Sequence, residues 1–239
     1  MIVRRLALVF SIVFCASLAL AAAAVAAGGM GPGKYTFNSS SANAFFGMGK
    51  KGGPPVASWQ VSVNQGLNSF KPTHPNGPRI VTNSTMVFVS EFDALGNGGF
   101  GCFVVPDASF TVSRDLKSAA LHTTLTADEA CPGFGTPVGG SKDVVFAGGN
   151  GGLALPITVD VGWTATGAVT TYQQSFSISC LDYNADGNST NQSTNAGATG
   201  TISALTGSFN SEFADVSTTV GKLNIRGIPQ VACSGPTGG

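Results

Sequence analysis

The residues best suited to binding an ion lie in the segment DYNADGN, where oxygen-bearing side chains recur at every second position: Asp182, Asn184, Asp186 and Asn188. This spacing matches the first half of a calcium loop, in which alternate oxygen ligands surround the ion and a glycine allows the sharp turn. The residue at the twelfth position is Ser193 rather than a bidentate glutamate. We therefore expect either a partial calcium site or an Asn/Asp/Gly hairpin loop without metal, and no other cofactor.

Two acidic residues have a spacing that could serve catalysis. Glu91 and Asp93 stand two positions apart in a predicted strand, so their carboxylates share a face, as a glycosidase would require. The alternative is a solvated rim, which the following turn LGNGG favours. The sequence contains no nucleophile elbow, zinc-protease helix, dinucleotide loop or phosphate loop in a suitable context. We therefore expect a protein without enzymatic activity and without catalytic residues.

The cysteines predict disulfide bonds. Cys15 lies in the apolar N-terminal segment, which is predicted to be a cleaved leader, and four cysteines follow it: Cys102, Cys131, Cys180 and Cys233. An even number in an oxidising compartment indicates two bridges, with three connectivities open. We favour Cys102 with Cys131, which closes a shorter loop, and Cys180 with Cys233, which would tie the end of the chain to the central strands.

Histidines are too few for a convincing zinc site. The chain has only His74 and His122 and no C-x-x-C pair. His74 lies among prolines and is expected to be exposed. His122 lies in a predicted strand, where a lone histidine is usually a surface or hydrogen-bonded residue. Asp160, on the polar face of another strand, is expected to form hydrogen bonds or to protect an edge.

The composition indicates an extracellular β-protein. The chain has 239 residues, of which 43% are hydrophobic and 10% are charged, against about 25% charged residues in an average domain. The length suits one all-β domain. Twelve basic residues balance twelve acidic ones, and without Arg4 and Arg5 of the leader the remainder carries a charge of about −2. We expect no nucleic-acid partner, because phosphate binding needs clustered Lys and Arg.

The N-terminus has the features of a signal peptide. Arg4 and Arg5 precede an unbroken apolar run that ends in the small-residue pattern AVA at residues 24–26. We therefore predict a signal peptide over residues 1–27 and a secreted protein, extracellular or periplasmic, with no membrane attachment after cleavage. A retained anchor is the alternative, because residues 6–27 are long enough to span a bilayer, but their alanine-rich end is weakly hydrophobic.

Strands dominate the predicted secondary structure. Residues 155–180 alternate apolar with polar side chains on both sides of the turn-prone TATGA, which predicts a β-hairpin. Trp163 and Tyr172 have the phase of the buried face, and Trp59 has that phase in an earlier strand. We therefore expect both tryptophans in the core. A second hairpin is predicted where residues 80–94 lead through LGNGG into GFGCFVV.

Polar and Gly/Pro-rich segments separate these strands. Residues 28–55 are predicted to be an N-terminal arm with one short strand at residues 34–38, and residues 66–79 and 181–200 to be loops. About ten antiparallel strands over residues 56–233, followed by a tail at 234–239, predict an all-β fold: a disulfide-stapled β-sandwich or jelly-roll-like domain. A β-solenoid would need a fixed repeat, which the sequence lacks.

These features favour a secreted, non-enzymatic β-sandwich that interacts with an extracellular protein or a glycan. A carbohydrate-binding module is the alternative. It would need exposed aromatic residues, for which Phe45, Phe46 and Tyr183 are the candidates outside the predicted core. A secreted hydrolase is the third hypothesis, with few titratable residues to support it.

Overall fold

The computed structural model describes residues 31–49, 55–73, 76–93, 98–131, 136–137, 143–145, 153–180, 183–203 and 208–227. Four strands are long: β1 (Gly33–Gly49), β2 (Pro55–Pro72), β12 (Tyr183–Ile202) and β13 (Ser208–Arg226). Those of middle length are β3 (Ile80–Asp93), β4 (Gly98–Val105), β6 (Ser118–Leu125), β10 (Ile157–Ala165) and β11 (Thr170–Cys180). The short elements are β5 (Phe110–Val112), β7 (Thr136–Pro137), β8 (Asp143–Val145), β9 (Leu153–Ala154) and the 3-10 turns η1 (Asp107–Ser109) and η2 (Ala127–Glu129).

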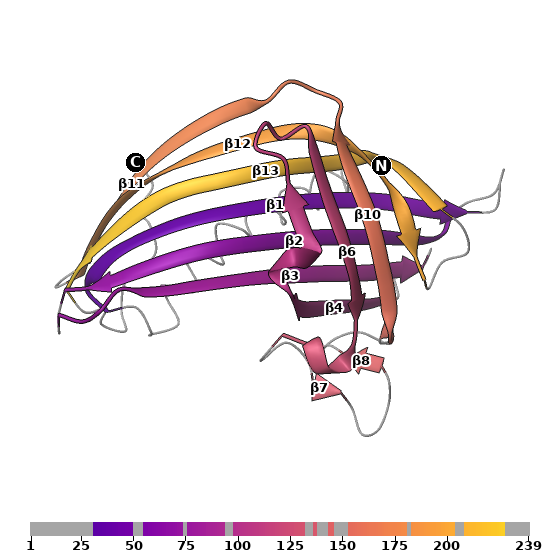
Figure 1. The fold of residues 1–239 in the computed structure, drawn as a ribbon, viewed down its shortest axis with the longest axis horizontal. Helices are drawn as coiled ribbons and strands as arrows, with labels where there is room; N and C mark the ends of the chain where they lie inside the picture. Colours follow the sequence, from indigo (N-terminus) through magenta and orange to yellow (C-terminus); the bar gives the residue numbers. More distant parts are fainter. Residues whose placement is uncertain are drawn as a thin grey trace.

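One antiparallel sheet of ten strands makes up most of the described chain. Its order is β4-β3-β2-β1-β13-β12-β10-β6-β5, and β11 also pairs with β12. Figure 1 shows the long strands curving across the molecule while β10 and β6 cross them steeply. The two layers of the sandwich are therefore two parts of one sheet: the long-strand layer, from β4 to β12, and the covering layer, β10-β6-β5. This confirms the predicted all-β, antiparallel sandwich.

Strand β12 is where one layer passes into the other. Along one edge it pairs with β13, and along the other it pairs first with β11 and then with β10. Its register to β13 shifts between Ala196 and Ala198, and such a bulge bends a strand and increases its twist. The predicted hairpin of residues 155–180 is therefore wrong in its pairing. Both strands exist, but each pairs with β12, because a polar segment that was predicted to be a loop supplies their partner.

The main core lies between the two layers. Alternate residues of both layers are buried there, including Val61, Val87, Leu121, Val159 and both tryptophans. Trp163 of β10 is buried and its Nε1 donates a hydrogen bond to the backbone oxygen of Asn43 in β1, at 2.9 Å. Trp59 of β2 is buried in the same core. The predicted burial of both tryptophans is confirmed.

A second, smaller apolar cluster lies where the covering layer does not reach, on the opposite face of the long strands. Tyr35, Ala185 and Ile225 are buried in it, and Phe70 stacks on Tyr35 with ring centroids 4.2 Å apart. By strand alternation, Tyr35 points to the other face from Ala42 and Ala44, which belong to the main core. The long strands therefore bury one face at one end and the opposite face at the other.

Three segments predicted to be mostly irregular form the long strands instead. Residues 33–49 of the predicted arm are β1, which pairs with β2 and β13 on its two sides. The predicted loops at residues 66–79 and 181–200 supply the end of β2 and most of β12. Ser, Thr and Asn resemble loop residues when they occur in runs. Here neighbours on both sides satisfy the backbone, so few apolar side chains are needed.

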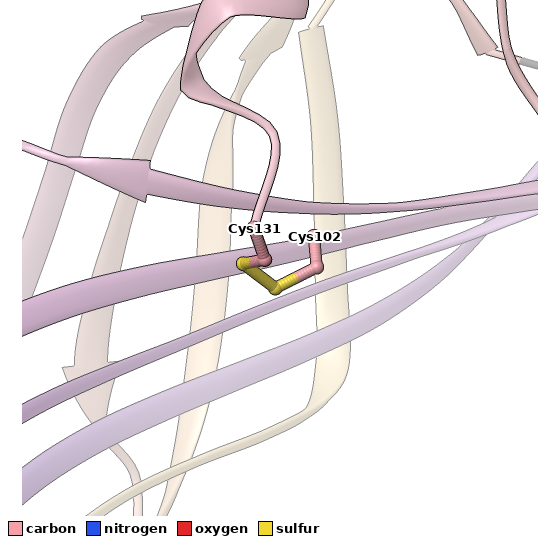
Figure 2. The surroundings of a disulfide bond; sticks show 2 residues. All are labelled: Cys102 and Cys131. Carbon is pink, nitrogen blue, oxygen red and sulfur yellow. A yellow bond between two sulfur atoms is a disulfide. The ribbon is translucent and has the colours of Figure 1, made fainter. Parts of the chain in front are cut away.

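One predicted disulfide is present. Cys102 of β4 is bonded to Cys131, which follows η2 (Figure 2). The backbone N–H of Cys131 also donates to the oxygen of Cys102 at 2.9 Å, so the bridge fastens this segment to the edge strand of the long-strand layer. Cys233 lies outside the described residues, and its bond to Cys180 stays a prediction.

Candidate binding surface

The long-strand layer extends beyond the covering layer and leaves part of its inner face open. By strand alternation, Thr36 and Asn38 of β1 share a face with the buried Ala42 and Ala44. The open part is concave, with a volume of about 630 Å³. We call it the open trough; its lining includes Thr36, Asn38, Leu67, Val81, Val220 and Lys222. It crosses five strands in the order β3-β2-β1-β13-β12, a width of about 19 Å at the usual strand spacing.

Three aliphatic side chains are exposed in the open trough. Leu67 is 47%, Val81 58% and Val220 54% exposed. Leu67 and Val220 are the cross-strand neighbours of Asn38 on its two sides. Polar residues thus separate apolar ones across the floor, which offers a ligand both van der Waals contact and hydrogen bonds.

A polar network closes the inner end of the open trough. The hydroxyl of Thr85 donates to Asp107 Oδ1 at 2.8 Å, and Asn83 Nδ2 donates to Oδ2 at 2.5 Å. Gln65 Nε2 donates to the backbone oxygen of Asp107 at 2.9 Å. A ligand in the open trough therefore meets the Asp107 network before it reaches the buried valines of the core.

The predicted calcium residues lie on a strand rather than in a loop. Asn184, Asp186 and Asn188 belong to β12, and Gly187 pairs with Phe176 and Leu223 in a regular ladder. Asp186 accepts a hydrogen bond from Arg226, and Asp182 lies outside the described residues. Among the described residues, no three His, Cys, Asp or Glu side chains gather as metal ligands would. The loop prediction is wrong, whereas calcium binding itself stays a prediction.

The acidic pair at the end of β3 is described only in part. Glu91 lies opposite Trp59 in the ladder with β2, and burial raises the pKa of its carboxyl. The side chain of Asp93 lies outside the described ones. A catalytic role for the pair stays a hypothesis.

Two polar residues of the covering layer face each other on its exposed side, and Asp160 protects no edge because β10 pairs with a strand on both sides. His122 of β6 and Asp160 of β10 are direct cross-strand partners, with Nδ1 and Oδ2 3.7 Å apart and both side chains exposed. The prediction that His122 is a surface residue is confirmed, and His74 lies outside the described residues.

The aromatic candidates are distributed differently from the prediction. Phe46 is buried and stacks on Phe209 with centroids 3.7 Å apart, so it cannot offer a platform to a sugar. Phe45 is half-buried, and the side chain of Tyr183 lies outside the described ones. Tyr172, which was predicted to be buried, is 64% exposed because it lies beside Asn191 on the face that points away from the covering layer. The sequence did not reveal this exposure, because alternation shows which residues share a face but not whether another layer covers that face.

Comparison with known proteins finds no matching family model and no matching curated protein. Within the described ranges, no helix is long and apolar enough to cross a membrane.

Proposed function

We propose that the chain is a secreted, non-enzymatic β-sandwich protein that binds an extracellular partner in the open trough. The observation that carries the proposal is the exposed inner face itself, where Leu67, Val81 and Val220 are left in water beside Asn38 and Thr36. A concave surface that presents a few aliphatic side chains beside hydroxyl and amide groups is typical of a ligand-binding site.

Two further observations support this proposal. The Cys102–Cys131 bridge is typical of proteins that fold in an oxidising compartment. The open trough offers amide, hydroxyl and aliphatic groups, which recognise a ligand, whereas hydrolysis would require positioned acids or a nucleophile.

A blocked trough tests the proposal. The protein would be applied to an array of extracellular polysaccharides and matrix proteins, and Asn38→Trp would be compared with Thr111→Trp. The first substitution fills the floor of the open trough, and the second adds the same bulk at an exposed position of β5. We expect Asn38→Trp to abolish the binding that Thr111→Trp retains. Equal binding by both variants, or no ligand on the array, would refute the proposal.

A carbohydrate-binding surface around Tyr172 is the second candidate. Tyr172 is exposed and lies opposite Asn191, whose Nδ2 donates to Thr219 Oγ1 at 2.8 Å. An aromatic ring beside amide and hydroxyl groups suits a neutral sugar. If this surface is the site, Tyr172→Ala should remove glycan binding while Asn38→Trp leaves it intact.

A further inference from the structure

Most basic residues that the structure describes gather around the open trough. Lys222 lines it directly, together with Arg79. Lys34 and Lys71 lie further along the same face of β1 and β2, and Arg226 follows on the same face of β13. The chain as a whole has equal numbers of basic and acidic residues, so this clustering is a product of the fold rather than of the composition.

These cations lack a matching number of carboxylates. Two described carboxylates lie near these cations: Asp186, which pairs with Arg226, and Asp107, which is held by Asn83 and Thr85 at the closed inner end, while Glu91 lies at the far end of the same face, opposite the buried Trp59. Within the described part of the chain, neither Lys34 nor Lys222 forms an ion pair. The open trough therefore has a net positive charge that no described group neutralises.

Lys34 and Lys71 place two positive charges side by side, which destabilises the protein when no ligand is bound. The two lysines are direct cross-strand partners, and like charges in this arrangement repel each other. Lys71 Nζ donates to the backbone oxygen of Gly77 at 2.5 Å, which holds its ammonium group toward that turn. An anionic ligand between the two ammonium groups would replace their repulsion with two favourable contacts.

We infer that the ligand of the open trough is an acidic polysaccharide, an inference that rests on the proposed function. Its carboxylates would meet Lys34, Lys71 and Lys222, its hydroxyls would bond to Asn38 and Thr36, and its C–H faces would pack on the exposed aliphatic side chains. An acyl chain fits less well, because the aliphatic residues alternate with polar ones and the trough is open along its length, so the chain would stay in contact with water.

The test uses polygalacturonate, alginate and hyaluronan, with methyl-esterified polygalacturonate as the neutral match of the first. We expect wild-type protein to bind at least one acidic polymer, to bind the esterified polymer weakly, and to lose affinity as salt is raised. The double variant Lys34→Gln/Lys222→Gln should lose roughly tenfold or more in affinity, since two charge-assisted contacts are removed. Lys117→Gln changes an exposed lysine in the turn between β5 and β6 and should bind like wild type. Unchanged melting temperatures would show that the variants are folded.

Several results would overturn the inference: no binding to any acidic polymer, equal binding of the esterified polymer, unchanged affinity of the double variant, or preference for DNA or for phosphatidylglycerol vesicles. The Asn38→Trp variant separates this failure from failure of the proposed function. If the acidic polymers fail while another extracellular ligand binds and is lost in Asn38→Trp, the open trough remains the site and only the ligand class is wrong.

Discussion

Single side chains join the two layers of the sandwich. Trp163 of β10 fills the core and also reaches the backbone of β1 through its Nε1 hydrogen bond to Asn43. Asn43 in turn donates from Nδ2 to both carboxylate oxygens of Asp215, at 3.1 and 3.3 Å, on the opposite face of the sheet. Asn43 thus binds the core through its backbone oxygen and the outer surface through its side-chain amide.

Trp163→Ala should destabilise the protein by about 3 to 5 kcal/mol, because it leaves a large cavity and removes the hydrogen bond from the indole to Asn43. Thr164→Ala, next to it on the exposed face, should change stability little. Denaturant unfolding followed by tryptophan fluorescence measures both effects. A small loss for Trp163→Ala, or emission typical of a water-exposed indole, would contradict the core position.

Asp215 should make stability depend on pH. Burial raises its carboxyl pKa, and the hydrogen bond from Asn43 offsets only part of that effect. Since the folded state then holds the proton more tightly than the unfolded state, the contribution of Asp215 to stability falls as the pH rises from the ordinary value of 3.8 through the raised one. Asp215→Asn should therefore melt at a higher temperature than wild type at pH 7, and the difference should vanish below pH 3.8.

Asp115 offers the control of opposite sign. Hydrogen bonds from the Ser113 side chain and from Lys117 lower its pKa. Its contribution is therefore present above the ordinary pKa and is lost as the pH falls through the lowered one. Asp115→Asn should not stabilise the protein at pH 7. If the two asparagine variants show the same pH dependence of melting, the environment assigned to Asp215 is wrong.

At the scale of elements, glycines and aromatic rings pair across the strands of the second cluster. The ring of Phe176 in β11 lies over Gly187 in β12, and the ring of Phe37 in β1 lies over Gly221 in β13. Each ring covers a backbone that has no side chain of its own, which pins the register of these polar strands. In the sequence Gly187 resembles the turn residue of a calcium loop, whereas in the fold it makes room for a ring.

Gly187→Ala tests this role. A Cβ there would lie 2.6 Å from both Phe176 Cζ and the backbone oxygen of Lys222, so we expect a loss of about 1 to 3 kcal/mol from overpacking. Gly197→Ala in the same strand is the matched control, since its Cβ would lie 3.6 Å from the nearest atom, the backbone oxygen of Ser211. Thermal melts should separate the two variants, and equal melting temperatures would refute the packing argument.

At the scale of the whole molecule, one open sheet folds over itself to form both layers, and the disulfide secures its edge strand β4. The double variant Cys102→Ser/Cys131→Ser should lose about 3 to 4 kcal/mol, as chain entropy predicts for cysteines 29 residues apart. Unfolding of the variant and of wild type under non-reducing conditions measures the loss. The same stability in both would mean that the segment after η2 is held without the bridge.

Secretion is tested on the mature protein. Mass spectrometry should show that the leader is lost near Ala27 and that the four remaining cysteines resist alkylation until reduction. Retention of the leader would favour the membrane anchor instead. Reactive Cys180 and Cys233 beside a blocked Cys102 would show that the second predicted bridge does not form.

The sequence by itself determined the all-β class and the burial of Trp59 and Trp163, and it favoured the Cys102–Cys131 pairing among three open connectivities. The first two follow from alternation within single strands, which is local in the sequence, and the pairing follows from the small number of cysteines, which allows few combinations. Only the tertiary structure decided that the Ser/Thr/Asn-rich segments at residues 33–49 and 183–202 are long strands, because their extended form depends on partners distant in the sequence. For the same reason the open trough could not be predicted: its lysines come from strands at opposite ends of the chain, and its exposure depends on where the covering layer stops.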